Sequence, residues 1–165
     1  MFLAEVDFSS LDLTGANLRE TNLDDATFKG AVLKGVNLSN SNSLRVDFSL
    51  ADLSNSNLSQ ANLDRSDFSG ANLTNAVLAS ADIQDVSLKG AILNSTDLRS
   101  AKLHRSDLTD ATLTNAKLAG AKFERAYLGK TVFEYSGKLK ADFTDAIMGR
   151  ANLQGLNLSN SVLQR

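Results

Sequence analysis

The sequence predicts an all-β solenoid with four walls and about eight coils, and three observations support this prediction. One five-residue unit repeats without a break, because a large apolar residue recurs at nearly every fifth position from 3 to 163, giving 33 units in 165 residues. Similar residues also recur at intervals of twenty, which corresponds to four units. The chain contains no proline, as suits a fold in which backbone N–H groups are donors in strand ladders.

The pattern within each unit predicts a short strand followed by a corner. We count from the large apolar residue, position i, which is Leu63 and then Phe68 in Ala61–Gly70 (ANLDR SDFSG). Position i−2 is small in nearly all units and position i−1 is usually polar, so i−2 and i share the inner face of a strand. Positions i+1 and i+2 are rich in Ser, Asn, Gly and charged residues, which favour turns. Only Ser43 and Lys138 replace the large apolar residue.

The twenty-residue period predicts which residues stack from coil to coil. Phenylalanine recurs at Phe8, Phe28, Phe48 and Phe68, and we expect these rings to form a stacked core column. Position i+2 of every fourth unit is charged in all nine copies: Glu5, Asp25, Arg45, Arg65, Asp85, Arg105, Arg125, Asp145 and Arg165. With coils spaced like strands, ~4.8 Å apart, the rod is roughly 40 Å long.

Units such as ANLRE, ADLSN, ANLDR, ANLTN and ANLQG resemble the consensus A(D/N)LXX of the pentapeptide-repeat family. The resemblance covers residues 1–165 and implies a right-handed quadrilateral parallel β-helix that forms a single domain. Members of this style are abundant in cyanobacteria and other bacteria. Because the family shares a scaffold and not an activity, the resemblance indicates the fold more strongly than the function.

Composition narrows the environment and the partners. There is no cysteine, and no apolar run approaches the ~20 residues of a membrane span. The net charge is −2, and we expect no nucleic-acid partner, no membrane span and a cytoplasmic location. Residues 1–82 carry 11 acidic and 5 basic side chains, whereas residues 83–165 carry 8 and 12. This charge gradient has two interpretations. It is either random drift among solvated residues, or a sign of head-to-tail self-association or of a partner that recognises one half of the rod.

Both ends of the chain are in repeat register, from Met1 to Arg165, and neither shows a helical cap. Solenoid ends expose core and strand edges unless they are covered. We therefore expect either that the ends stack on another molecule or that the sequence is a segment of a longer protein.

The first irregularity is Ser41–Arg45 (SNSLR), where Ser43 takes the core position and Leu44 follows it. Two arrangements fit: Ser43 faces the core with its hydroxyl bonded to backbone, or a bulge swings Leu44 inward. We favour the bulge; an outward Leu44 is instead a contact candidate, together with Leu50.

Corners and stacked carboxylates give two further expectations. Gly15, Gly30 and Gly35 lie at i+2, where a positive φ is expected. Asp47 and Asp67 occupy equivalent places in consecutive coils, roughly 5 Å apart, and repel each other mildly. No ligand cage surrounds them in the sequence, so we expect no metal site.

The repeat loosens in the second half, which is where we expect a partner surface. Asp or Asn fills i−1 in 13 of the first 17 units but in only 5 of the last 16. We expect Lys138 to snorkel or flip out of the narrow core. The region 127–140 is the candidate surface, with these residues: Tyr127, Val132, Tyr135, Lys138 and Leu139, with Leu44 as a separate contact candidate. The alternative is a degenerate repeat that is merely tolerated.

The sequence lacks the constellations that carry catalysis. His104 is the only histidine and lies at a corner, so a Cys–His nucleophile or a histidine metal site cannot be assembled. Carboxylate pairs such as Asp24 and Asp25 lie at exposed corners with no pocket to raise a pKa. We therefore expect no enzyme, no cofactor and no metal.

Three functions remain. The first is a non-catalytic structural or protein-interaction scaffold. The second is a DNA mimic that binds a type II topoisomerase, as the quinolone-resistance branch of the family implies, although here only the first half is acidic. The third is an ice-binding face, indicated by a recurring column of hydroxyl side chains that charged and amide residues interrupt: Thr14, Ser54, Thr74 and Thr114.

Overall fold

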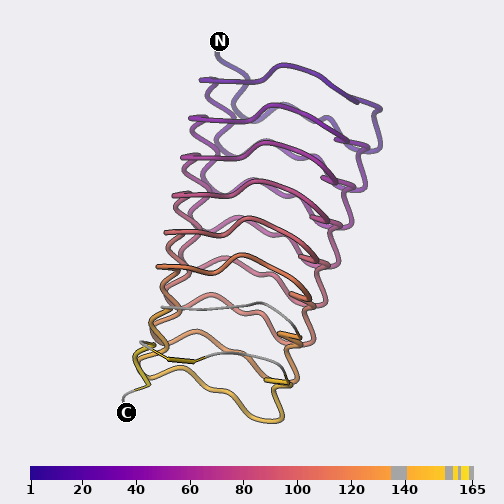
Figure 1. Ribbon diagram of the computed structural model, residues 1–165. Coiled ribbons are helices and arrows are strands. Elements are labelled where there is room, and N and C mark those ends of the chain that lie inside the picture. Colours follow the sequence, from indigo (N-terminus) through magenta and orange to yellow (C-terminus); the bar gives the residue numbers. More distant parts are fainter. Residues whose placement is uncertain (135–140, 155–157, 160, 164–165) are drawn as a thin grey trace.

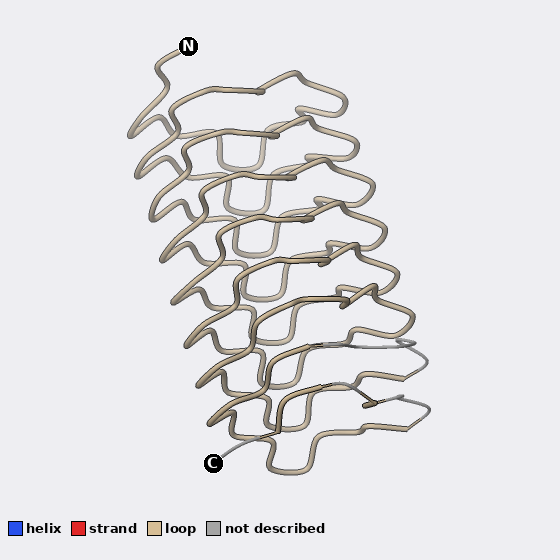
Figure 2. Ribbon diagram, turned by 60° about the vertical axis from the view of Figure 1, so that its left-hand side comes forward, coloured by secondary structure: helices blue, strands red, loops and turns tan. Residues whose placement is uncertain are grey.

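The computed structural model is a single column of stacked coils that runs from the N-terminus at one end to the C-terminus at the other (Figures 1 and 2). It describes residues 1–134, 141–154, 158–159 and 161–163. Within these ranges there is no helix and no extended strand; each unit contributes one bridging residue at i−1, followed by a turn at i+1 and i+2. The predicted all-β, four-walled solenoid is confirmed, with strands reduced to single bridges.

Parallel bridges join each i−1 residue to the one twenty positions later, from Phe2–Asn22 to Asp142–Val162. This register defines four walls. Wall A contains the units centred on residues 3, 23, 43 and onward by twenty, wall B those from 8, wall C those from 13 and wall D those from 18. Walls A and C are opposite, as are walls B and D.

Backbone hydrogen bonds connect every coil to the next. The N–H of Leu3 donates to the carbonyl of Asn22 at 2.8 Å, and the N–H of Asn22 donates back to Met1 at 3.0 Å. The N–H of Glu5 also donates across the coils, to Asp24 at 2.9 Å. Since this pattern recurs throughout the described chain, most polar backbone groups are paired with a neighbouring coil.

The corners depend on a left-handed residue at i+2. Every described i+2 residue has a positive φ, between 52° and 75°, including the expected Gly15, Gly30 and Gly35. The N–H after the corner donates to the carbonyl before it, as Ala31 does to Phe28 at 2.9 Å. A positive φ at the third position is typical of a type II turn. The sequence did not indicate that non-glycine residues would adopt it too.

The core is filled by the residues at i and i−2. Phe8, Phe28, Phe48 and Phe68 stack on wall B, with successive ring centroids 4.7, 5.2 and 4.9 Å apart. A second cluster lies near the C-terminal end, where the rings of Phe123 and Phe143 stack at 5.0 Å and Phe133 packs edge-on against both. Like residues therefore lie above like residues, as the twenty-residue period predicted.

The predicted bulge at Ser41–Arg45 is wrong. Ser43 is fully buried and keeps the regular ladder, because its N–H donates to Asn62 at 2.8 Å. Leu44 stays at its turn position and is half-buried. The hydroxyls of Ser41 and Ser43 lie 2.9 Å apart, so the buried Ser43 hydroxyl is paired with another side chain and the register needs no shift.

A buried hydroxyl from the next coil completes the turn after Ser43. The hydroxyl of Ser66 donates to the Ser43 carbonyl at 2.9 Å and accepts from the Val46 N–H at 3.0 Å. It therefore bridges the carbonyl and the N–H that hydrogen-bond directly to each other in most other turns. Three other i−2 hydroxyls donate to a carbonyl 23 positions earlier: Thr96, Ser106 and Thr131.

We predict that Ser66→Ala lowers the free energy of unfolding by about 1–3 kcal/mol, because it leaves a buried N–H and a buried carbonyl unpaired. The matched control is Ser56→Ala, at the same i−2 position and fully buried, whose hydroxyl oxygen has no partner in the described structure. This variant should be neutral or slightly stabilising. Urea unfolding of the two variants measures the difference, and equal effects would contradict the bridging role of Ser66.

Candidate functional site

The outer positions i−1, i+1 and i+2 form the surface, and Asp or Asn at i−1 has a structural role there. Its side-chain oxygen accepts the N–H of i+1, as Asp47 does from Ser49 at 2.8 Å and Asn57 from Ser59 at 3.0 Å. This local hydrogen bond pre-forms the corner. It gives a physical reason for Asp or Asn in the A(D/N)L consensus.

The stacked carboxylates are occupied by these turns. Asp47 and Asp67 are bridged in consecutive coils, and each accepts a backbone N–H at 2.8 Å. Among the residues that the structure describes, no group of three or more His, Cys, Asp or Glu side chains could hold a metal ion.

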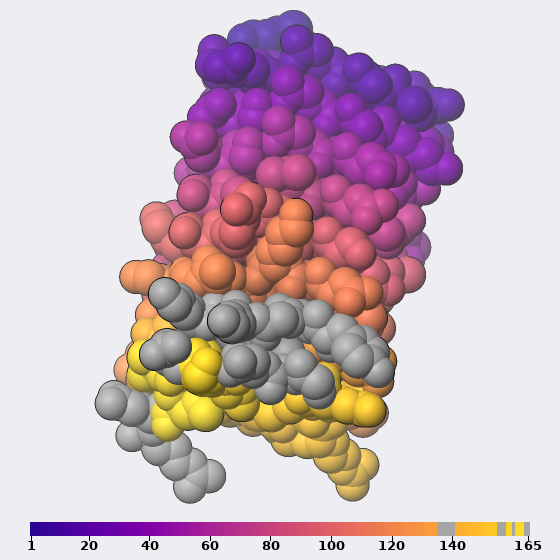
Figure 3. Space-filling view, in the orientation of Figure 1, coloured from indigo at the N-terminus to yellow at the C-terminus, as the bar shows by residue number. Residues whose placement is uncertain are grey.

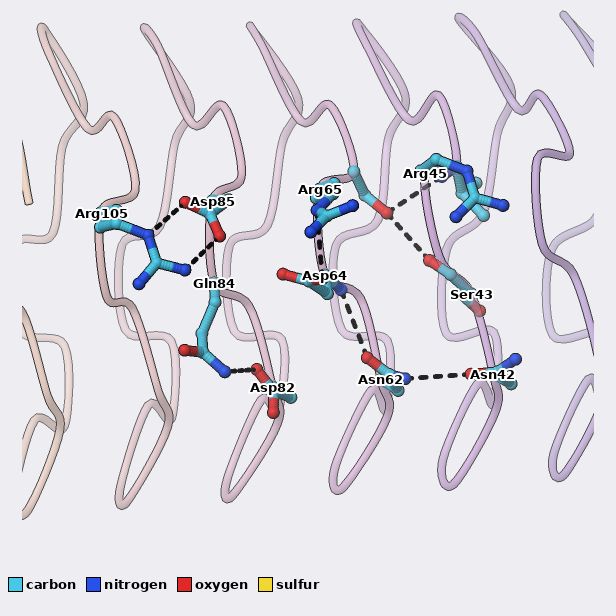
Figure 4. A network of polar contacts seen from close by, with 12 residues as sticks. Asn42, Ser43, Arg45, Asn62, Asp64, Arg65, Asp82, Gln84, Asp85 and Arg105 are labelled. Atoms are coloured by element: carbon cyan, nitrogen blue, oxygen red, sulfur yellow. Dashed lines mark hydrogen bonds and ion pairs between the residues drawn. The ribbon is translucent and has the colours of Figure 1, made fainter.

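The charged i+2 residues of wall A form a corner column in which each aspartate lies next to an arginine of an adjacent coil; Figure 4 shows Arg45, Arg65, Asp85 and Arg105 of this column. The guanidinium of Arg45 makes two 2.6 Å hydrogen bonds to Asp25, and that of Arg105 makes two to Asp85. Arg125 approaches Asp145 at 3.8 Å. Hydrogen bonds from the arginines lower the pKa of Asp25 and Asp85, so these carboxylates stay ionised.

His104, the only histidine, lies on wall A with its Nδ1 2.8 Å from a carboxylate oxygen of Glu124 in the next coil. Both side chains are largely covered by their neighbours. Among the described residues no serine hydroxyl hydrogen-bonds this imidazole, so the geometry shows a cross-coil contact between His104 and Glu124 and not a nucleophile with its base.

Two of the exposed apolar residues at i−1 lie near the C-terminal end of wall B, whereas Phe2 and Val162 lie on wall A and Ile92 lies on wall C. Tyr127 is 49% exposed and Ile147 is 56% exposed, and they are bridged in consecutive coils. Gly129 and Gly149 follow them at i+1, so bare backbone lies beside both side chains. We call Tyr127, Ile147, Gly129 and Gly149 the wall B patch. The apolar Ile147 twenty positions after Tyr127 was the signal for it in the sequence.

The other candidate residues lie elsewhere. Val132 is half-buried on the adjoining wall C, and Leu44 is half-buried on wall A near the N-terminal end, so the structure does not bring Leu44 to Tyr127. Tyr135, Lys138 and Leu139 fall outside the described residues. Figure 3 shows a continuous outer surface along the rod on the face it presents.

Cations flank the wall B patch. Arg125 and Asp145 precede Tyr127 and Ile147 at one corner, and Lys130 and Arg150 follow the patch at the other corner. Arg125 and Lys130 lie 3.8 and 3.6 Å from their nearest carboxylates, compared with 2.6 Å for Arg45, so their charges are only loosely compensated. An apolar strip between cations is suited to a partner that is both apolar and acidic.

In the described part of the chain, no helix has the length and apolarity that a membrane span requires. The surface of the described chain is instead set by short turns and charged corners.

We predict that stability falls in acid through carboxylates such as Asp97, which is largely buried and accepts three hydrogen bonds from the Arg99 side chain that lower its pKa. A lowered pKa adds stability above the ordinary value near ~4, and this stability is lost as pH falls through the folded-state pKa. Asp97→Asn should therefore lower the free energy of unfolding by about 1 kcal/mol at neutral pH and by less in acid. Urea unfolding across the acid range tests this.

Asn57→Ala is the control for that series, because it removes a turn acceptor on the same wall without removing a titratable group. Its destabilisation should be the same at every pH. If the deficit of Asp97→Asn were equally independent of pH, the ion pair would not be its cause.

Three solved structures are similar to this chain. A trypsin-treated variant of QnrB1, a plasmid-mediated fluoroquinolone resistance protein, matches 95% of this chain and 90% of its own with 18% identity and a TM-score of 0.58. HetL, a protein involved in heterocyst differentiation regulation in the cyanobacterium Nostoc sp. strain PCC 7120, matches 98% of this chain and 88% of its own with 27% identity and a TM-score of 0.36. A thylakoid-lumen pentapeptide repeat protein of Arabidopsis thaliana matches 73% of this chain and 67% of its own, with 23% identity and a TM-score of 0.45.

Curated proteins give no significant match to the sequence. Family models match nearly all of it: the pentapeptide repeat region matches residues 2–78, 43–117 and 61–137, and the model of eight pentapeptide repeats matches residues 139–165. The structural neighbours are right-handed quadrilateral β-helices, and the expected fold class is confirmed with that hand. The chain belongs to the pentapeptide-repeat family.

Proposed function

We propose that this protein is a non-catalytic scaffold that binds a protein partner through the wall B patch. The observation that carries the proposal is the pair Tyr127 and Ile147, two half-exposed apolar side chains at positions that Asp or Asn occupies in most of the chain. Each substitution removes a turn acceptor and exposes apolar surface. An exposed apolar residue that weakens its own turn does not stabilise the fold, so contact with a binding partner explains its presence better.

The chemistry of the described surface supports a scaffold rather than an enzyme. His104 is held by Glu124, and the carboxylates of Asp25 and Asp85 have lowered pKa values that make them poor general acids. Their positions on convex corners give no means of desolvating a reacting group.

The alternative is a DNA-mimicking inhibitor of a type II topoisomerase. It is favoured by the acidic first half, residues 1–82, and QnrB1 has the same fold. Such a mimic requires rows of uncompensated carboxylates to imitate phosphates. Here Asp25 and Asp85 are neutralised by Arg45 and Arg105 in the adjacent coils, and the second half is basic. We therefore rank this function below the scaffold.

Head-to-tail self-association stays a prediction, as do a cytoplasmic location and a single domain spanning residues 1–165. End contacts would bring the acidic half of one copy to the basic half of the next. Such contacts are heterologous and do not close, so they produce rods of increasing length.

We predict that Tyr127→Asn combined with Ile147→Asn abolishes binding of the partner in affinity capture from the source cell. Asn is the consensus residue at i−1, so the variant should keep its turns and its fold. Ile92→Asn is the control: it replaces another exposed i−1 apolar residue, on wall C. Partners that the double variant retains at full yield would rule out the wall B patch.

We also predict that the protein leaves DNA gyrase supercoiling unchanged at micromolar concentration, because its carboxylates are paired with arginines between coils. Inhibition in this assay would favour the topoisomerase alternative. Arg45→Ala, which frees the carboxylate of Asp25, provides a more acidic comparison for the same measurement.

A further inference from the structure

Leu50 is an exposed residue that stability does not explain. It lies at i+2 on the corner between walls B and C, has a φ of 60° and is 66% exposed. A positive φ is unfavourable for a bulky side chain by about 1–2 kcal/mol, and the same corner of nearby coils carries Gly30, Gly70 and Gly90. Leu50 therefore combines backbone strain with poor solvation.

A glycine in the next coil makes room for the Leu50 side chain. Gly30 and Gly70 precede and follow it at the same corner, in the adjacent coils. A Cβ atom added to Gly70 would lie only 2.9 Å from a terminal methyl of Leu50, so the leucine rests on this glycine. The corner thus presents one apolar side chain on a smooth surface, next to the carboxylates of Asp47 and Asp67 on wall B.

The same wall carries the complementary surface nearer the C-terminus. The wall B patch lies four to five coils from Leu50, ~19–24 Å along the axis at the usual strand spacing. The N-terminal units of wall B carry Asp7, Asp47 and Asp67 against Lys29, and its later units carry Lys89, Lys130 and Arg150 against Asp107 and Asp110. Wall B therefore has a net acidic end that contains Leu50 and a net basic end that contains the patch.

The charge gradient selects the orientation of two copies that share this wall. Residues 1–82 have a net charge of −6 and residues 83–165 a net charge of +4. When two rods lie side by side in antiparallel orientation, each acidic half faces a basic half, and both pairings form at once. Parallel rods would place like charges together.

We propose that two copies of this chain pack wall B against wall B in antiparallel orientation, so that Leu50 of each copy lies against Tyr127 and Ile147 of the other copy. The two-fold axis then crosses wall B near Lys89, about midway between the two contact sites. The contact is isologous and closes as a dimer. This inference rests on the proposed function, because it names the occupant of the wall B patch.

Sedimentation equilibrium at low salt and micromolar concentration tests the dimer. Leu50→Asn and Tyr127→Asn should each raise the dissociation constant roughly tenfold or more. Neither variant should lower the melting temperature of the monomer, since Asn accepts a positive φ at i+2 and supplies the turn acceptor at i−1. Ile92→Asn, on wall C, should leave the dissociation constant unchanged.

Cross-linking tests the orientation, because the chain has no cysteine of its own. Lys89→Cys places a thiol near the two-fold axis and should give a disulfide-linked dimer under mild oxidation. Arg99→Cys is the matched control in the same coil on the opposite wall D; both substitutions remove a basic residue that pairs with an aspartate. It should not cross-link.

Several outcomes would overturn the proposal. They are a monomer throughout the concentration range, a dimer that Leu50→Asn and Tyr127→Asn leave intact, equal cross-linking at both thiols, or a mass that keeps growing with concentration, which indicates end-to-end rods. If the protein were monomeric yet lost a captured partner on Tyr127→Asn, the second copy would be wrong and the proposed scaffold function would remain. If the substitutions abolished neither the dimer nor the binding of a captured partner, both the dimer and the proposed scaffold surface would be wrong.

Discussion

The whole molecule depends on the backbone ladder that joins each residue to the one about twenty positions away. Leu3 donates to Asn22, Asn22 donates to Met1, and the same pair of bonds recurs through the described coils. The ladder requires that each coil contain the same number of residues, because an irregular coil would misalign donors and acceptors. The corner at i+2 meets this requirement by adopting one conformation whether the residue is Gly70, Arg65 or Leu50. Local strain at many corners is thus offset by pairing between coils.

The sequence predicted the architecture because the period of five and the period of twenty each have a direct geometric meaning. It could not predict the outcome at Ser43, where two arrangements were compatible with one residue pattern. The deciding contacts come from Ser41 in the same unit and Ser66 in the next coil, so they depend on stacking as well as on local preference. The second Phe cluster was foreseeable in part, since Phe123 and Phe143 are twenty apart, but the edge-on contact of Phe133 required the wall geometry.

The candidate surface was less predictable, for a physical reason. Core positions are constrained by packing, whereas i−1, i+1 and i+2 face solvent and accept many residues. The sequence indicated Tyr127 and Val132 as departures from the repeat, but not how exposed each side chain would be. Separation onto walls A, B and C follows from counting units, and exposure follows only from the neighbours that each side chain finds. Consensus positions thus specify the scaffold, and departures from consensus mark where the scaffold has been modified.

The cross-coil ion pairs of wall A also limit how the chain can change in length. Asp25 meets Arg45, and Asp85 meets Arg105, only because exactly four units separate them. Insertion of one pentapeptide would turn everything downstream by a quarter revolution, so a phenylalanine column would continue on a different wall and charged partners would separate. Whole revolutions preserve every column. Evolution of such rods should therefore favour growth or shrinkage in steps of twenty residues, and partners that read one wall would still find it intact.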